Sequence, residues 1–176
     1  GGFEGRALKQ GDRIPINSDG GIGSVPLRTI DQKTVIALFD RQSFRVTIGP
    51  QSDFFAQESL DLFFNSNFEV LEESNRRGLR LRGPQIVRSR AGDMLTEGVS
   101  LGAIQISHDG QPIILFVEHQ TTGGYPKIAN IIFADLHRVG QLRPRDSLRF
   151  ELVSFPQARD ILLSQESILK NALRTL

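Results

Sequence analysis

The sequence predicts a mainly β fold, a closed β-barrel with a few helices and a C-terminal helix, and three observations support this. Glycine is frequent, with 17 in 176 residues, and it supplies the tight turns that short strands need. Apolar residues fall in many short runs, several of which alternate with polar residues as in half-buried strands. Only the C-terminal end holds a long stretch with helical spacing. Because 39% of the residues are hydrophobic, the chain can bury one core.

The N-terminal part of the sequence is rich in turn-forming residues. Residues 7–12 predict a turn that leads into a short strand over Arg13–Ile16. The segment Asn17–Ser24 follows and holds three glycines beside Asn, Asp and Ser, a composition typical of a loop or linker. We therefore expect a boundary there, with residues 1–24 as the end of a preceding unit plus a linker and residues 25–176 as the main domain.

Two β-like runs open the main domain, and a helix follows them. Thr34–Phe39 is a short run rich in β-branched residues, and Phe44–Ile48 alternates, so one of its faces should be buried. Gly49-Pro50 breaks the second strand. A helix is then predicted over residues 52–64, with a polar capping residue at its start.

The middle of the chain holds the clearest strand signals. Residues 68–71 form a short β-like run, and residues 79–82 alternate strictly, which places two arginines on one face of a strand. The apolar runs 102–107 and 112–117 flank Asp109-Gly110. Asp-Gly between two apolar runs is the strongest short-range signal of a β-hairpin, and we expect one here.

The C-terminal part of the sequence predicts one further strand and one long helix. Residues 127–134 are apolar enough for a buried strand or a helix, and periodicity does not decide between them. Residues 148–153 form another strand. Ser154 and Pro156 are start signals for a helix over about 156–174, whose apolar residues recur at intervals of three and four. We expect this stripe to pack on the barrel or on a partner chain, with burial of Ile161, Leu162, Leu169 and Leu173.

Composition excludes several classes of protein. The absence of cysteine excludes disulfides and cysteine-ligated zinc, and the three histidines show no metal-binding spacing, so we predict no metal site. A net charge of +1 gives no case for nucleic-acid binding. No apolar run approaches the length of a membrane span, and no signal peptide opens the chain. We expect a soluble, cytoplasmic protein that binds neither nucleic acid nor membrane.

The segment Gln120–Lys127 concentrates groups that bind polar ligands. Two glycines, Gly123 and Gly124, allow left-handed φ angles and a close approach of the backbone, and successive amides in such a turn bind anions. The only tyrosine and one of four lysines follow them. The alternative is an ordinary glycine loop with Tyr125 packed over it. Our candidates in this segment are catalytic Lys127 and Tyr125, and substrate-binding Gln120, Thr121, Thr122, Gly123 and Gly124.

Two further candidates lie in predicted strands. Arg80 and Arg82 belong to an arginine-rich segment that suits a carboxylate, a phosphate or an acidic partner; the alternative is the solvated face of an edge strand. Gln105 lies in the middle of a strand, where an amide is costly unless it is paired. It either lines a pocket or faces water. Glu97 and Glu118 are isolated acids, and nothing in their spacing selects one as a general base.

Several short motifs occur in an order that resembles a known family. They include Gly2–Leu8, Gly49-Pro50-Gln51, Gly78–Pro84, Gly102–Gln105, Asp109–Ile113, Gln120–Lys127, Ala134-Asp135-Leu136 and Gly140–Pro144. The chain resembles the KipA-like family, also called allophanate hydrolase subunit 2 or the biotin-dependent carboxyltransferase C subunit, of which it would be the C-terminal portion. It departs from the family at residues 74–78, where members often read Ser-Asp-Arg-Met-Gly.

The resemblance implies a cyclophilin-like barrel for residues 25–176 and a carboxyltransferase-type function. The chain would be part of a two-subunit enzyme that acts on urea or a related small amide, with a partner similar to KipI or to allophanate hydrolase subunit 1. We assign no cofactor to this chain directly; carboxybiotin from a carrier protein, or ATP in the complex, are the implied candidates. Gly123, Gly124 and Lys127 suit a developing negative charge, and Gln105 and Gln120 suit an amide.

Two other functions stay open. The same module occurs in ATP-dependent oxoprolinase, which converts pyroglutamate to glutamate, and KipA itself regulates a KipI-like partner without turnover. A site that lies between subunits cannot be complete in one chain, so we expect the isolated chain to be inactive and to expose apolar surface that allows homo-oligomers.

Overall fold

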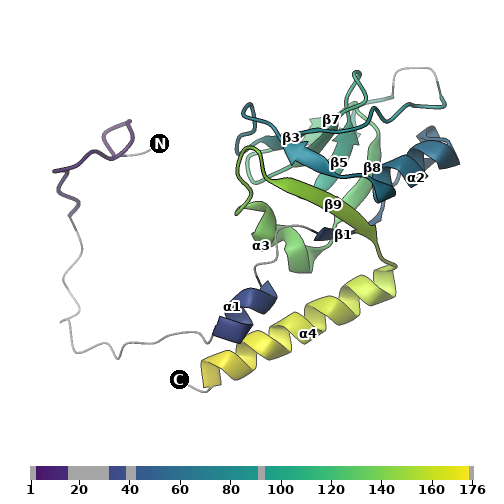
Figure 1. Cartoon of the computed structure of the whole chain (residues 1–176). Coiled ribbons are helices and arrows are strands. Elements are labelled where there is room, and N and C mark those ends of the chain that lie inside the picture. The colour runs from purple at the N-terminus through teal and green to yellow at the C-terminus, as the bar shows by residue number, and fades with distance from the viewer. Residues whose placement is uncertain (1–2, 16–31, 39–42, 91–93, 175–176) are drawn as a thin grey trace.

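The computed structural model describes residues 3–15, 32–38, 43–90 and 94–174, and its main body is a β-barrel (Figure 1). Seven strands close in the order β1-β8-β5-β6-β3-β2-β9, which confirms the predicted mainly β, closed-barrel fold. The strands are β1 Ser43–Ile48, β2 Phe68–Val70, β3 Gly78–Arg82, β5 Ala103–Ile106, β6 Pro112–Leu115, β8 Lys127–Ile131 and β9 Ser147–Leu152.

The barrel closes where its first and last strands meet. All other neighbouring strands pair antiparallel, whereas β1 and β9 pair parallel, with Phe44 opposite Phe150. Parallel strands cannot be joined by a short hairpin. The chain between β1 and β9 forms all the other strands of the barrel, and the pairing of β1 with β9 then closes it.

Aromatic side chains fill much of the barrel core. Phe44 and Phe68 are fully buried, and Phe63 stacks on Phe150 with a distance of 4.8 Å between ring centroids. Phe63 comes from the helix α2 (Gln57–Asn65), so this helix contributes directly to the core. The strict alternation predicted for β3 is confirmed, because Leu79 and Leu81 face this core and the arginines between and after them face outward.

The predicted helix over residues 52–64 is interrupted. Ser52–Phe54 forms a short 3-10 helix η1, and α2 begins at Gln57. Between them Phe55 has extended backbone, forms a bridge with Arg88 and buries its ring. The tertiary contact of Phe55 thus overrides the local helical spacing.

Two predicted strands in the N-terminal part are wrong. The run predicted as a strand over Thr34–Phe39 lies largely in a helix, α1 (Gln32–Leu38), since a short apolar run does not distinguish the two structures. Residues 13–15 form no strand. The predicted linker, residues 17–24, and the boundary that it marks lie outside the described residues.

The C-terminal helix α4 (Phe155–Arg174) begins within one residue of the predicted start. Ser154 and Gln157 form a capping box: the side chain of Gln157 accepts from the backbone N–H of Ser154 at 2.8 Å. None of the helices in the described part of the chain is long and apolar enough to cross a membrane.

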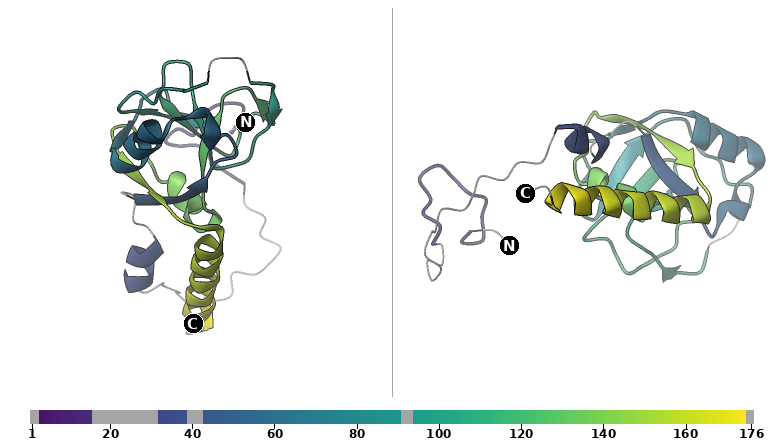
Figure 2. Two further views of the ribbon diagram at one scale, coloured as in Figure 1. Left: turned by 90° about the vertical axis from the view of Figure 1, so that its right-hand side faces the viewer. Right: turned by 90° about the horizontal axis from the view of Figure 1, so that it is seen from below.

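The apolar stripe of α4 is covered only in part, contrary to the predicted burial. Figure 2 shows α4 projecting from the barrel, with α1 beside it. Ile161 and Leu162 are half-buried, whereas Leu169 is exposed, and the side chain of Leu173 lies outside the described set. The one polar residue in the stripe, Gln165, donates to the carbonyl oxygen of Ala134 at 2.9 Å. That hydrogen bond ties the helix to the barrel where apolar packing does not.

A buried ion cluster fastens β1 to the segment after β8. That segment contains the 3-10 helix η2 (Phe133–Asp135) and the helix α3 (Leu136–Val139). Asp135 is fully buried, pairs with Arg45 of β1, and accepts from Nη1 of Arg138 at 3.0 Å. Arg138 also donates to the carbonyl oxygen of Ser43 and lies 4.9 Å from the centre of the Phe44 ring. The Ala134-Asp135-Leu136 motif therefore holds the strand that closes the barrel.

The Asp109-Gly110 hairpin is confirmed between β5 and β6. Gly110 has a φ of +77°, as such a turn requires. The Ser107 hydroxyl donates to the Asp109 carboxylate, and the backbone N–H of Gln111 donates to it as well. The hydrogen bond from Ser107 is the main cause that holds the pKa of Asp109 below its ordinary value; burial opposes it, and the Gln111 N–H adds to it.

The lowered pKa of Asp109 predicts how the hairpin responds to acid. Because the folded-state pKa lies below the ordinary value of 3.8, the ionised carboxylate stabilises the fold above that pH, and this contribution is lost as the pH falls through the folded-state pKa. We expect Asp109→Asn to lower the free energy of unfolding by a constant amount between about pH 5 and pH 8. The difference from wild type should shrink below pH 4. Urea unfolding of both proteins at several pH values measures this difference. If the difference grows on acidification, the ionised Asp109 carboxylate does not stabilise the hairpin.

Candidate functional site

A cavity of about 280 Å³ lies on the outer wall of the barrel, over β3, β6 and β5. Register places Arg80, Ile113 and Gln105 side by side across these strands, so their side chains share one outward face. Loop residues complete the lining, which consists of Asn75, Arg77, Gly78, Arg80, Gln105, Ile113, Leu115, Gln120 and Tyr125. Four predicted site residues, Arg80, Gln105, Gln120 and Tyr125, are thus brought together.

Two glutamine amides meet in this cavity. The side chain of Gln105 is almost fully buried and donates through Nε2 to the carbonyl oxygen of Tyr125 at 3.1 Å. Its Oε1 lies 3.5 Å from Nε2 of Gln120. Each primary amide carries two N–H donors and two acceptor positions. The pair therefore keeps donor and acceptor capacity for an amide ligand, with the orientation of Gln105 fixed by its own contacts.

The glycine pair has a different role from the one predicted. Neither Gly123 nor Gly124 has the left-handed φ of an anion-binding turn. Gly123 instead belongs to a short strand, and a Cβ atom there would lie 2.7 Å from Nε2 of Gln105. A larger residue at position 123 would therefore displace the Gln105 amide, because the backbone packs directly on it.

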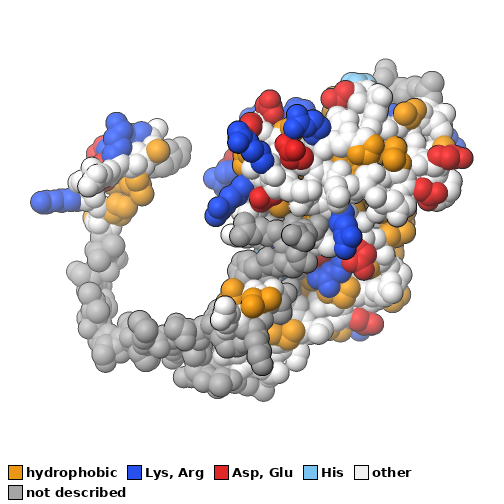
Figure 3. All heavy atoms as spheres, in the orientation of Figure 1, with side chains coloured by type: hydrophobic (Ala, Val, Ile, Leu, Met, Phe, Trp, Pro, Cys, Tyr) orange, Lys and Arg blue, Asp and Glu red, His pale blue; other side chains and the backbone are white. Residues whose placement is uncertain are grey.

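The arginines in and next to β3 lie in two places: some line the cavity and others lie on the surrounding surface. Arg82 pairs with Glu69 of β2 at 2.9 Å and does not line the cavity. Figure 3 shows basic and acidic side chains side by side over this edge of the barrel. In contrast, Arg77 and Arg80 line the cavity, and neither forms an ion pair with a carboxylate among the described residues, although the charge of Arg80 helps to lower the pKa of Asp109. They leave the cavity suited to a ligand that carries negative charge.

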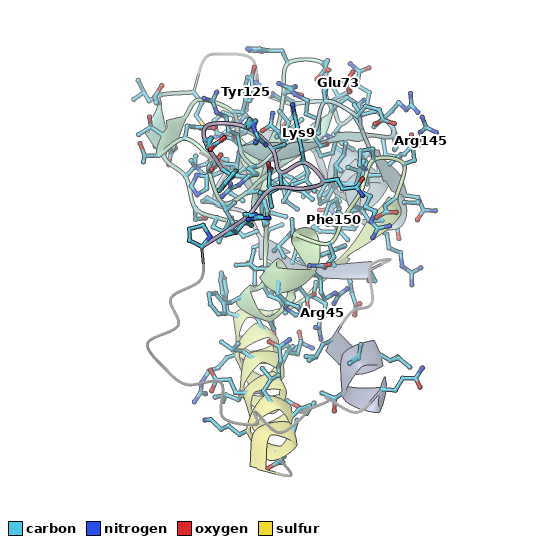
Figure 4. All side chains as sticks on the ribbon, turned by 90° about the vertical axis from the view of Figure 1, so that its left-hand side faces the viewer. Lys9, Arg45, Glu73, Tyr125, Arg145 and Phe150 are labelled. Atoms are coloured by element: carbon cyan, nitrogen blue, oxygen red, sulfur yellow. The ribbon has the colours of Figure 1, made fainter. Side chains whose placement is uncertain are left out.

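Tyr125 also lines the cavity. Its ring meets the edge of the His108 ring at 5.1 Å between centroids, and the guanidinium of Arg88 lies 5.8 Å from its centre. Arg88 itself donates to the carbonyl oxygen of Ile106. Figure 4 shows Tyr125 on the side of the barrel away from α4, whereas Arg45 lies between the barrel and that helix.

Lys127, the predicted catalytic cation, is buried. Only 5% of its side chain is exposed. Its Nζ lies 3.4 Å from the Glu97 carboxylate and 3.4 Å from the carbonyl oxygen of Gly98. The ammonium thus has partners within the chain and is not among the groups that line the cavity. Its predicted catalytic role stays a prediction.

The remaining predicted residues lie around the cavity without lining it. Thr121 and Thr122 are exposed, and Gly124 has only distant neighbours. Asn75 and Arg77 do line it, and sequence reasoning missed them. The sequence signal that could have identified Asn75 and Arg77 is the departure of this chain from the Ser-Asp-Arg-Met-Gly pattern at both positions. Among the described residues no group of three or more histidine or acidic side chains could hold a metal ion.

Comparisons with known proteins agree with this architecture. A family model described as the carboxyltransferase domain, subdomains A and B, matches residues 1–152. A 5-oxoprolinase subunit of Escherichia coli is 37% identical over 158 residues, which cover 90% of this chain and 49% of that protein. Urea amidolyase of Saccharomyces cerevisiae is 33% identical over 186 residues, which cover 97% of this chain and 10% of that protein.

A solved structure shows the same likeness. The crystal structure of the K. lactis urea amidolyase matches with a TM-score of 0.70 and 32% identity over 74% of this chain and 8% of that one. The chain spans about half the length of the oxoprolinase subunit and a small part of the urea amidolyases. These similar proteins are subunits or segments of larger enzymes.

Proposed function

The chain belongs to the family of carboxyltransferase domains, subdomains A and B, and we propose that it supplies the amide-binding wall of a two-part enzyme acting on urea or a related small amide. A KipI-like or allophanate hydrolase subunit 1-like protein would complete the site. A cytoplasmic location is part of this proposal. The observation that carries it is the pair of cavity-lining amides, Gln105 and Gln120, on the same cavity wall as Arg80.

The geometry supports distinct roles for these groups. The two glutamine amides would orient the N–H and C=O edge of the substrate amide. Arg80 and Arg77 would offset the negative charge of a carboxylate or of an oxygen on which charge develops. The phenol of Tyr125, which also lines the cavity, would donate to a substrate oxygen. Lys127 receives no role in this proposal, because its ammonium contacts Glu97 and Gly98 and the residue does not line the cavity.

One of the two implied cofactors would suit the groups that line the cavity. The ureido head of carboxybiotin has the same N–H and C=O edge as an amide, and its carboxylate matches Arg80, so Gln105, Gln120 and Arg80 would hold it. When bound, it supplies the activated carboxyl group. For ATP, the other implied cofactor, the sequence offers no P-loop spacing, and we assign no residue of this chain to it.

A second candidate function is the ATP-driven opening of pyroglutamate. One feature of the cavity favours it: pyroglutamate combines an amide with a carboxylate, and the cavity is lined by two glutamines and two arginines. Urea lacks the carboxylate. The complete protein, with its partner and ATP, should be assayed with each compound for product formation. Binding of a KipI-like partner without turnover of either compound would favour the regulatory alternative and contradict the proposal.

Substitutions of the cavity residues test the proposed roles in that complete enzyme. Gln105→Ala and Arg80→Ala each remove a contact worth about 1.5–3 kcal/mol, so kcat/KM should fall by about ten- to 150-fold. Arg90→Ala is the matched control, since Arg90 forms an exposed ion pair with Asp53 away from the cavity. Equal kcat/KM for Arg80→Ala and Arg90→Ala would refute the role of Arg80.

A further inference from the structure

A two-stranded ribbon outside the barrel covers the Gln105 amide. It consists of β4 (Glu97–Gly98) and β7 (Thr122–Gly123), and one further backbone hydrogen bond, from Val99 to Thr121, extends it. A two-stranded ribbon of this length is not stable alone. Its position over the barrel therefore depends on contacts with other elements.

The ribbon determines how Gln105 is packed. A Cβ atom on Gly123 would lie 2.7 Å from Nε2 of Gln105 and 3.3 Å from Cγ1 of Val99. The Gln105 side chain is 1% exposed, although it stands on the outward face of β5. The ribbon and the segment after it provide that cover, so a displaced ribbon would release the amide.

One carboxylate joins the ribbon to the barrel. Glu97 of β4 lies 3.4 Å from Nζ of Lys127, and its other oxygen accepts from Nε2 of Gln51 at 3.0 Å. Gln51 in turn accepts from the backbone N–H of Lys127 at 3.2 Å. Lys127 completes the attachment by contacting the carbonyl oxygen of Gly98. Both partners of Glu97 are nine-tenths or more buried.

We propose that Glu97 is a positioning residue. Through Lys127 and Gln51 it holds the β4–β7 ribbon against the barrel, and this attachment, the latch, fixes the orientation of the Gln105 amide in the cavity. The effect of Glu97 on the substrate rests on the proposed function. The attachment of the ribbon through Glu97 does not. It also gives the Gly49-Pro50-Gln51 motif a role, because that turn carries Gln51 to the carboxylate.

The latch can be tested through Tyr125. This residue directly follows the ribbon, its carbonyl oxygen binds Gln105, and it is the only tyrosine in a chain without tryptophan. Its fluorescence in the 176-residue chain therefore reports on one position. We expect Glu97→Gln to increase acrylamide quenching of Tyr125, because the ion pair with Lys127 is lost. In the wild type the quenching should rise slightly with ionic strength, and in Glu97→Gln it should not, because salt screens only weakly a pair in which Glu97 is half-exposed and Lys127 is buried.

Glu118→Gln is the matched control. Glu118 pairs with Arg76 at 3.1 Å, is similarly exposed and lies only a few residues before the ribbon, but it does not contact it. This variant should quench like the wild type, with the same response to salt. Thermal melting of all variants shows that they are folded. Equal quenching and salt response in Glu97→Gln and wild type would overturn the latch.

The effect on the substrate is measured separately in the complete enzyme. We expect Glu97→Gln to raise KM about fivefold with little change in kcat, and Glu97→Asp to restore part of the loss. Gln105→Ala is assayed beside it. If Gln105→Ala raises KM and Glu97→Gln does not, the positioning role is wrong. If Gln105→Ala leaves kcat/KM unchanged, the proposed function fails, while the fluorescence result still decides on the latch.

Discussion

Replacing Asp135 by alanine should lower the free energy of unfolding by about 3–5 kcal/mol, because it leaves the buried Arg138 without its charge partner. Asp135 is fully buried between Arg45 and Arg138, and the side chain of Arg138 is only 7% exposed. For a domain of this size the loss corresponds to a fall in Tm of roughly 6–20 °C. Thermal and urea unfolding of the 176-residue chain measure it.

Asp53→Ala provides the control for this experiment. Asp53 also pairs with an arginine, Arg90, but both side chains are more than half exposed. An exposed pair contributes at most about 1 kcal/mol. If Asp135→Ala lowers the free energy of unfolding by no more than this amount, the buried cluster does not hold β1 in place.

Replacing Gly49 by alanine should destabilise the chain by about 3 kcal/mol or more, since the added methyl group meets backbone that cannot move aside. Its Cβ would lie 2.2 Å from the carbonyl oxygen of Lys127 and 2.6 Å from the backbone nitrogen of Ala129. Relief requires β8 to shift and would break the 2.8 Å hydrogen bond from Gly49 to Ile128.

Gly98→Ala is the matched control for Gly49→Ala. No atom lies within 4 Å of a Cβ at position 98, so the same substitution should change stability by less than about 0.5 kcal/mol. Urea unfolding of both variants compares them directly. If both substitutions lower the free energy of unfolding by a similar amount, the loss at position 49 comes from reduced backbone freedom and not from the close approach of β8.

The features predicted correctly from the sequence are those that local interactions decide. Asp109-Gly110 specifies its turn through neighbouring residues, and α4 begins where Ser154 and Gln157 cap each other. The alternation of β3 likewise identified Arg80 as outward-facing. Each of these signals lies within a few residues of the structure that it specifies.

The features that were missed depend on partners distant in the sequence. The run 34–38 is helical although its β-branched residues favour a strand, and the ring of His137 donates through Nε2 to the carbonyl oxygen of Leu38 at 2.7 Å. The burial of Lys127 requires Glu97, thirty positions earlier along the chain, to lie against it. For the candidate site, the sequence identified the residue types that bind an amide, but not the ribbon that covers them.

The parallel pairing of β1 with β9 also has a consequence for biosynthesis. During translation β1 emerges early, yet its second barrel neighbour is the last strand to be made. Until then, the nascent sheet has an unpaired edge on each side and is open to association with other chains. Loops must also close over most of the domain before this contact forms, so folding should be slow relative to helical proteins of the same length. Cells would therefore have to protect this chain most in the interval between the synthesis of β8 and that of β9.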